Sequence, residues 1–123
     1  MPVSTLAEAK RIEFHGLTAH PIAVPSRGTA ELAIWHLEVA PGLRGEEHTV
    51  DHEEVFVVRT GRLSGTIGGE PCEAGPGDAL IVPPGVPFAL ANDGGETASA
   101  VVCTSAGVRA SLNGRTVVPP WSE

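Results

Sequence analysis

Residues 45–61 read GEEHTVDHEEVFVVRTG, and no other stretch says more about the fold of this chain. The stretch holds two of the five histidines, His48 and His52, together with four glutamates and the apolar run 55–58. Imidazole and carboxylate groups beside an apolar strand are the components of a small polar site within a packed interior. We therefore expect the chemistry of this protein to be located here.

The composition favours one β-rich domain over residues 1–123. With 41% apolar and 19% charged residues, the chain can bury a core of ordinary size. Its 15 glycines and 11 prolines are spread along the sequence, which is typical of many short strands joined by tight turns. Helix is expected only as one short turn within residues 5–11.

Alternating apolar and polar residues predict the strands. Residues 33–39 alternate with a period of two, which places Trp35 on one face and His36 on the other. Gly68-Gly69 and Asn113-Gly114 are hairpin turn signals. About ten strands follow, and together they predict a closed all-β sandwich or barrel. The expected strand ranges are 12–15, 22–24, 30–40, 55–58, 63–67, 70–73, 79–82, 87–91, 97–104, 108–112 and 115–118.

Charge and cysteine content exclude several classes of protein. A formal charge of −7 argues against nucleic-acid binding, which requires basic patches. Two cysteines, Cys72 and Cys103, are too few for a disulfide framework and indicate reduced thiols in a cytoplasmic protein. No apolar run approaches 18 residues and no signal peptide is recognisable, so we expect no association with a membrane.

The residues around the opening stretch resemble the first signature motif of the cupin superfamily. That motif has Gly, five residues, His, one residue, a second His, three or four residues, Glu, six residues and Gly. This chain matches the spacing with Gly42, His48, Glu54 and Gly61, but Val50 stands where the second His belongs.

The second cupin motif is matched in the same way. Its pattern is Gly, five residues, Pro, one residue, Gly, two residues, His, three residues and Asn. The chain supplies Gly77, Pro83, Gly85 and Asn92 at these positions, with Phe88 in place of the His. Every spacing is kept, whereas two of the four metal ligands are replaced.

The resemblance implies an all-β cupin jelly-roll barrel of two antiparallel sheets. It implies N-terminal strands within residues 1–40, barrel motifs at about 42–92 and C-terminal strands within 97–123. Cupins commonly bind Fe, Mn, Ni or Zn through three His and one Glu, and they hold a small molecule in the barrel mouth. Small cupins usually pair, so the resemblance also implies a homodimer.

Whether this chain binds a divalent metal stays open at this point. His48, His52 and Glu54 share parity, so an unbroken strand would direct all three to one face as a three-ligand site. A turn before Glu54 would leave the direction of His52 undetermined. The other interpretation is a metal-free barrel in which His48 and Glu54 are acid–base residues. A helix carrying His48 and His52 as zinc ligands is disfavoured by the β-branched run that follows.

Three functions are compatible with these residues, the third being a degenerate barrel kept as a structural or partner-binding unit. The first is a small enzyme of isomerase, dehydratase, cyclase or oxygenase type, with His48, His52 and Glu54 as catalytic residues. Its substrate would contact apolar side chains, namely Trp35, Val50, Phe56 and Phe88. The apolar setting would raise the pKa of Glu54 towards that of a useful general acid or base. The second is a non-catalytic ligand-binding or sensing cupin with a lost metal site.

Overall fold

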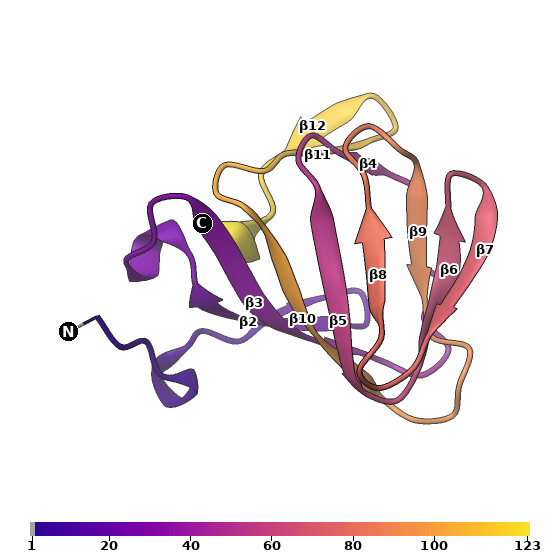
Figure 1. The fold of residues 1–123 in the computed structure, drawn as a ribbon, viewed down its shortest axis with the longest axis horizontal. Helices are drawn as coiled ribbons and strands as arrows, with labels where there is room; N and C mark the ends of the chain where they lie inside the picture. The colour runs from indigo at the N-terminus through magenta and orange to yellow at the C-terminus, as the bar shows by residue number, and fades with distance from the viewer. Residues whose placement is uncertain (1) are drawn as a thin grey trace.

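The computed structural model describes residues 2–123, which form a barrel of two antiparallel layers (Figure 1). The predicted all-β jelly-roll architecture is therefore confirmed. The strands are β1 (Ile12–Phe14), β2 (Leu17–Ala23), β3 (Leu32–Val39), β4 (Thr49–Val50), β5 (Glu54–Thr60), β6 (Leu63–Ile67), β7 (Glu70–Ala74), β8 (Ala79–Val82), β9 (Phe88–Ala91), β10 (Ala98–Ser105), β11 (Ala110–Leu112) and β12 (Arg115–Val117). Short 3-10 helices lie at η1 (Leu6–Glu8), η2 (Pro25–Arg27) and η3 (Pro120–Ser122).

The two layers differ in continuity. The first layer is one six-stranded sheet in the order β1-β2-β3-β10-β5-β8. The second consists of two three-stranded sheets, β7-β6-β9 and β12-β11-β4. Backbone bridges from Arg44 to Ala91 and from His48 to Phe88 join them, so the segment before β4 continues the layer beside β9.

The core lies between the layers because the strands are apolar on their inner faces. In β3 the buried residues Ala33, Trp35, Leu37 and Val39 alternate with more accessible ones, as the sequence pattern predicted. The strand β10 shows the same alternation along its whole length. Removing these side chains from water stabilises the barrel by about 25 cal/mol for each Å² of apolar surface buried.

Tight turns define the strand registers. The hairpin of β6 and β7 closes at Gly68-Gly69, with Ile67 opposite Glu70. Asn113 and Gly114 have φ values of 51° and 77°, the pair of positive angles that a two-residue hairpin turn requires. Both turns were predicted from the sequence.

One strand is longer than the sequence pattern indicated. We predicted a strand at residues 22–24, whereas β2 begins at Leu17 and contains Pro21. A proline lacks the N–H that a strand interior needs, and this argued against a continuous strand. The register of β2 against β3 shifts between Pro21 and Ala23, and this irregularity accommodates the proline.

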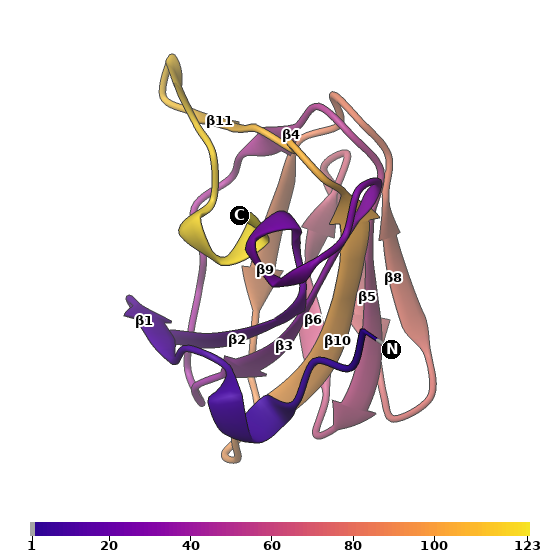
Figure 2. The same cartoon turned by 90° about the vertical axis from the view of Figure 1, so that its left-hand side faces the viewer.

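The C-terminal segment packs against one end of the first sheet (Figure 2). In η3, the Trp121 ring lies 6.5 Å from that of Trp35 and 6.1 Å from that of Phe14, measured between ring centroids. The backbone N–H of Ser26 donates to the carbonyl of Glu123 at 2.7 Å. Within residues 2–123, no helix has the length and apolar character needed to cross a membrane.

Candidate active site

One end of the barrel gathers the residues of both motifs. Strand β5 begins at Glu54, which lies opposite Val82 at the end of β8. Val50 ends β4, and Phe88 begins β9. These strand ends lie together at the upper end of the barrel in Figure 1, so the turns between the strands bring motif residues from distant parts of the sequence to one place.

Glu54 is the buried acid of this end. Its side chain is 5% exposed and shares the inner face of β5 with Phe56 and Val58. No hydrogen bond from another described side chain to its carboxyl group is present among residues 2–123. Burial alone raises the pKa of the Glu54 carboxyl from 4.5 to about 7, because the charged form loses its hydration.

His48 lies against Phe88. Their backbones exchange two hydrogen bonds, of 2.9 and 2.8 Å, and their ring centroids are 4.1 Å apart. The His48 Nδ1 atom lies 3.0 Å from the carbonyl oxygen of Glu46. Because a carbonyl can only accept, Nδ1 carries the proton, and in the neutral ring Nε2 is left as an acceptor.

The apolar residues expected to contact a substrate are core residues. Val50, Phe56 and Phe88 are between 3% and 4% exposed, and the rings of Phe56 and Phe88 lie 6.0 Å apart in edge-on contact. Trp35 is 2% exposed and packs against Trp121. The first three therefore form the apolar surroundings of this end, and their contact with a substrate remains a prediction.

His52 does not join the other two candidates. Residues 51–53 form the turn between β4 and β5, and no helix is present there. His52 is 45% exposed, and its Nδ1 lies 2.9 Å from Asp51. The backbone N–H of Arg109 also donates to Asp51. Although partial burial acts in the opposite direction, these two hydrogen bonds lower the pKa of Asp51. The turn and the Asp51 hydrogen bond together hold His52 outside the barrel.

The donor set does not fit the metal that the cupin resemblance implies. Two ligand positions carry Val50 and Phe88, whose side chains have no donor atom. Among residues 2–123, no three His, Cys, Asp or Glu side chains lie close enough to hold one metal ion. The proposed three-ligand set of His48, His52 and Glu54 is therefore not assembled, because the turn breaks the strand parity on which it relied.

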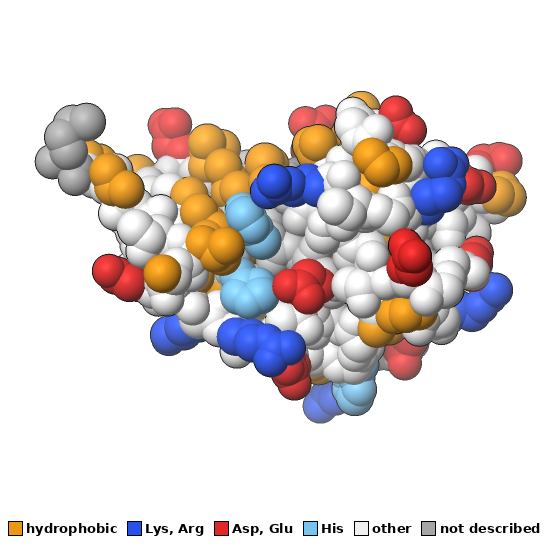
Figure 3. Space-filling view, turned by 90° about the horizontal axis from the view of Figure 1, so that it is seen from below, with side chains coloured by type: hydrophobic (Ala, Val, Ile, Leu, Met, Phe, Trp, Pro, Cys, Tyr) orange, Lys and Arg blue, Asp and Glu red, His pale blue; other side chains and the backbone are white. Residues whose placement is uncertain are grey.

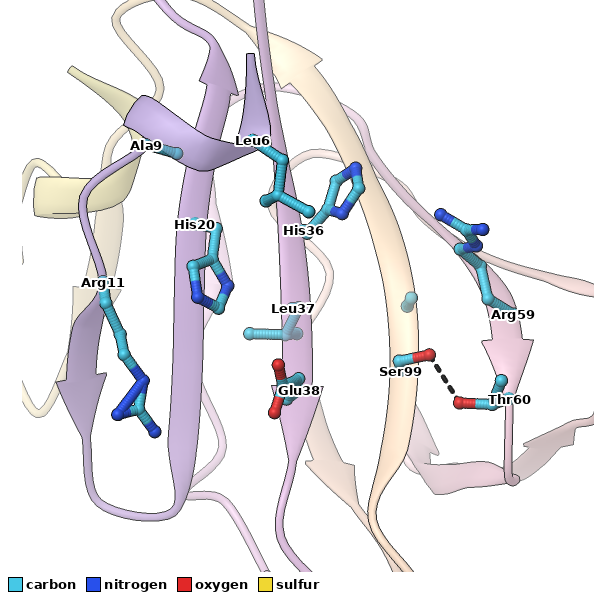
Figure 4. A pocket seen from close by; sticks show the side chains of 11 residues that line it. Leu6, Ala9, Arg11, His20, His36, Leu37, Glu38, Arg59, Thr60 and Ser99 are labelled. Atoms are coloured by element: carbon cyan, nitrogen blue, oxygen red, sulfur yellow. Dashed lines mark hydrogen bonds between the residues drawn. The ribbon is translucent and has the colours of Figure 1, made fainter.

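The outer face of the six-stranded sheet holds a polar hollow that was not predicted from the sequence. The hollow measures about 470 Å³, and Figure 4 shows its lining side chains. His20 and His36 face each other across β2 and β3, while Arg59 lies on β5. The alternation of residues 33–39 did place His36 outside, but only the strand registers reveal its neighbours.

The fold and site therefore combine an antiparallel β-barrel with a buried carboxyl and a histidine at one end. The cupin domain family matches residues 35–104, which is more than half of the chain, and the chain therefore belongs to this family. No curated protein matches the sequence.

Solved structures share the fold at low sequence identity. An RmlC-like cupin from Shewanella frigidimarina NCIMB 400 is 19% identical, with a TM-score of 0.72 over 84% of this chain and 88% of that one. The polyketide cyclase RemF from Streptomyces resistomycificus is 21% identical, with a TM-score of 0.73 over 85% and 79%. A Streptomyces PAC13 variant with uridine is 17% identical, with a TM-score of 0.69 over 83% and 78%.

Proposed function

We propose that this cupin is a small enzyme that catalyses proton transfer on a largely apolar, oxygenated small molecule. The observation that carries the proposal is the buried Glu54 side chain, which is 5% exposed at the motif end of the barrel. The reaction class is isomerisation, dehydration or cyclisation, none of which needs an external oxidant or reductant. A polyketide cyclase of the same fold supports this choice.

Glu54 is suited to exchange a proton near neutral pH. A general acid or base works best when its pKa is close to the working pH, and burial raises that of Glu54 to about 7. Val82 lies opposite Glu54 on β8, and Phe56 shares the buried face of β5 with it; neither side chain can donate or accept a hydrogen bond. A polar atom of a bound substrate is then the natural partner for this otherwise unpaired group.

His48 is the second group that we assign to the reaction. Its Nδ1–H is occupied by the carbonyl of Glu46, so Nε2 is the atom that can accept or relay a proton. The ring also contacts that of Phe88, at a tilt of 49° between the two ring planes. We propose a mechanism without a metal ion, because Val50 and Phe88 stand at two of the expected ligand positions and have no donor atoms.

Hydrogen–deuterium exchange tests this proposal and does not require the natural substrate. Small cyclic ketones, enones and hydroxy ketones are screened for binding, and each bound compound is then followed by NMR in D₂O. We expect the wild-type protein to exchange a ligand C–H for deuterium, and Glu54→Gln to slow this by about 10² to 10⁴-fold. The matched control is Glu53→Gln, because Glu53 is the exposed neighbour of the same chemical type.

Two outcomes of this experiment contradict the proposal. Exchange that is equally fast in Glu54→Gln removes Glu54 from the mechanism. Ligands that bind without exchange or conversion favour the second candidate, a non-catalytic ligand-binding cupin. The close packing of Val50 and Phe88, each 3% exposed, is the observation that favours this second function.

We also propose that two copies of the chain pair as a homodimer. The solvent-facing side of the six-stranded sheet carries an apolar row of Ile81, Val55, Cys103 and Ile34, set in adjacent registers on four strands. Ile81 is 57% exposed. A sheet face of this kind is better stabilised when a second copy covers it.

A further inference from the structure

We propose that the outer hollow is a second binding site, which takes a small organic anion with an apolar body. The anionic head, a carboxylate or a phosphate ester, would lie between Arg59 and His36, and the apolar body would contact Leu6. The site lies outside the barrel and is therefore separate from the proposed reaction at Glu54.

Strand register assembles the polar floor of the hollow. His20 lies opposite His36 on adjacent strands, and Ser99 lies opposite both Glu38 and Thr60. The Oγ atoms of Ser99 and Thr60 are 2.6 Å apart and hydrogen-bonded. In Figure 4 these side chains project from β2, β3, β10 and β5 into one open space.

A bulge directs Arg59 towards the hollow. The register of β10 against β5 shifts between Ser99 and Ala100, at the point where Arg59 is the additional residue of β5. A bulge of this kind changes the direction in which a side chain leaves the sheet. Among residues 2–123, Arg59 takes part in no ion pair, so its guanidinium is available to a ligand.

More basic than acidic side chains line the hollow, although the chain as a whole carries −7. Arg59 and Arg11 line it with the two histidines, and Glu38 is the one acidic group of the lining. Arg11 is paired with Glu13 at 2.7 Å, which leaves Arg59 as the principal charge. Figure 3 shows two histidines, basic groups and an acidic group gathered on this face.

The protonation behaviour of His36 supports the same interpretation. The pKa of His36 is lowered from 6.5 by burial, and further by the positive charges of Arg59 and His20. Burial penalises a charge of either sign, whereas the positive field of Arg59, which disfavours a protonated His36, favours an anion.

The N-terminal segment supplies an apolar wall. Leu6 in η1 is 54% exposed, and with Ala9 it borders the hollow above His36 (Figure 4). An exposed leucine in the same hollow as the Arg59 guanidinium matches a ligand with both an apolar and an anionic part.

NMR titration with model anions tests the proposal. Benzoate and phenyl phosphate are added while the imidazole signals of His20, His36 and His48 are followed, and benzyl alcohol serves as the neutral analogue. We expect saturable shifts of His20 and His36 with at least one anion, and tenfold or more weaker binding of benzyl alcohol. The tighter of the two anions identifies the carboxylate or the phosphate ester as the natural head group.

Charge variants provide the decisive comparison. We expect Arg59→Gln to weaken binding about tenfold or more, because it removes a charged hydrogen-bond donor. Glu38→Gln is expected to strengthen binding by about threefold or more, because it removes the repelling carboxylate. Arg115→Gln, on the distant β12 strand, is the matched control and leaves binding unchanged.

Several results would overturn this second site. They are the absence of saturable shifts, equal binding of benzyl alcohol, or equal affinity in wild type and Arg59→Gln. Shifts confined to His48 would place the anion at the barrel end instead. The test does not depend on catalysis at Glu54, so failure of one proposal leaves the other intact.

Discussion

At the scale of single residues, Glu54 links stability to pH. The folded protein binds a proton at Glu54 with a pKa of about 7, against 4.5 for an ordinary glutamate. Between these two values the folded state holds a proton that the unfolded chain has released, so stability falls as the pH rises. The contribution of Glu54 is fully present below about pH 4.5 and is lost by about pH 7.

Urea unfolding across this pH range measures the effect. We expect Glu54→Gln to be more stable than wild type at pH 8 by about 3 kcal/mol, at 1.36 kcal/mol for each pH unit between the two pKa values. Near pH 4, below both pKa values, the two proteins should be almost equally stable. Glu53→Gln, at the exposed neighbouring position, should not alter the pH dependence. Parallel pH profiles for wild type and Glu54→Gln would show that Glu54 is not desolvated.

At the scale of strands, Gly65 allows β6 to lie close to β9. Gly65 has a φ of 138° and pairs with Leu90, and a Cβ atom there would overlap the carbonyl oxygen of Ala89. Gly69, in the adjoining hairpin turn, also has a positive φ, of 79°, but a Cβ there meets no atom within 4 Å. The two glycines share backbone strain and differ in the space around them.

Alanine substitution separates these two effects. Gly69→Ala should cost about 1 kcal/mol, which is the usual cost of a positive φ. Gly65→Ala should cost about 3 kcal/mol or more, because β6 and β9 must also move apart. Thermal unfolding of both variants measures the difference. Equal melting temperatures would mean that the pairing of β6 and β9 contributes little to stability.

The strands and turns also show which parts of the fold and of the candidate site could be predicted from the sequence. Glycine and proline spacing located the turns and motifs, because few residues tolerate those backbone angles. Val50 and Phe88 could be recognised as lost ligands by position alone. The direction of His52 could not be predicted, since it depends on a turn that the hydrogen bonds of Asp51 stabilise. The pairing of His20 with His36 depends on the register between β2 and β3, which local sequence patterns do not determine.

At the scale of the whole molecule, the proposed dimer uses the outer face of the six-stranded sheet. We expect sedimentation or light scattering to give twice the chain mass of 12.7 kDa. Ile81→Lys should shift the protein towards the monomer, because a charge in the apolar row opposes burial. Val117→Lys is the control, since Val117 is equally exposed, at 57%, but lies on the β12 hairpin. A wild-type monomer at about 100 μM would contradict the dimer.

The contact between Trp35 and Trp121 gives the molecule an optical reporter of its own. These are the two tryptophans of the chain, and their indole rings lie 6.5 Å apart at an angle of 56°. Transitions of rings so close and so tilted couple, which produces a circular-dichroism couplet. Because one ring belongs to β3 and the other to η3, the couplet disappears when η3 detaches, even while the strands persist. Comparing its loss with that of the β-sheet signal distinguishes fraying of the C-terminal segment from cooperative unfolding.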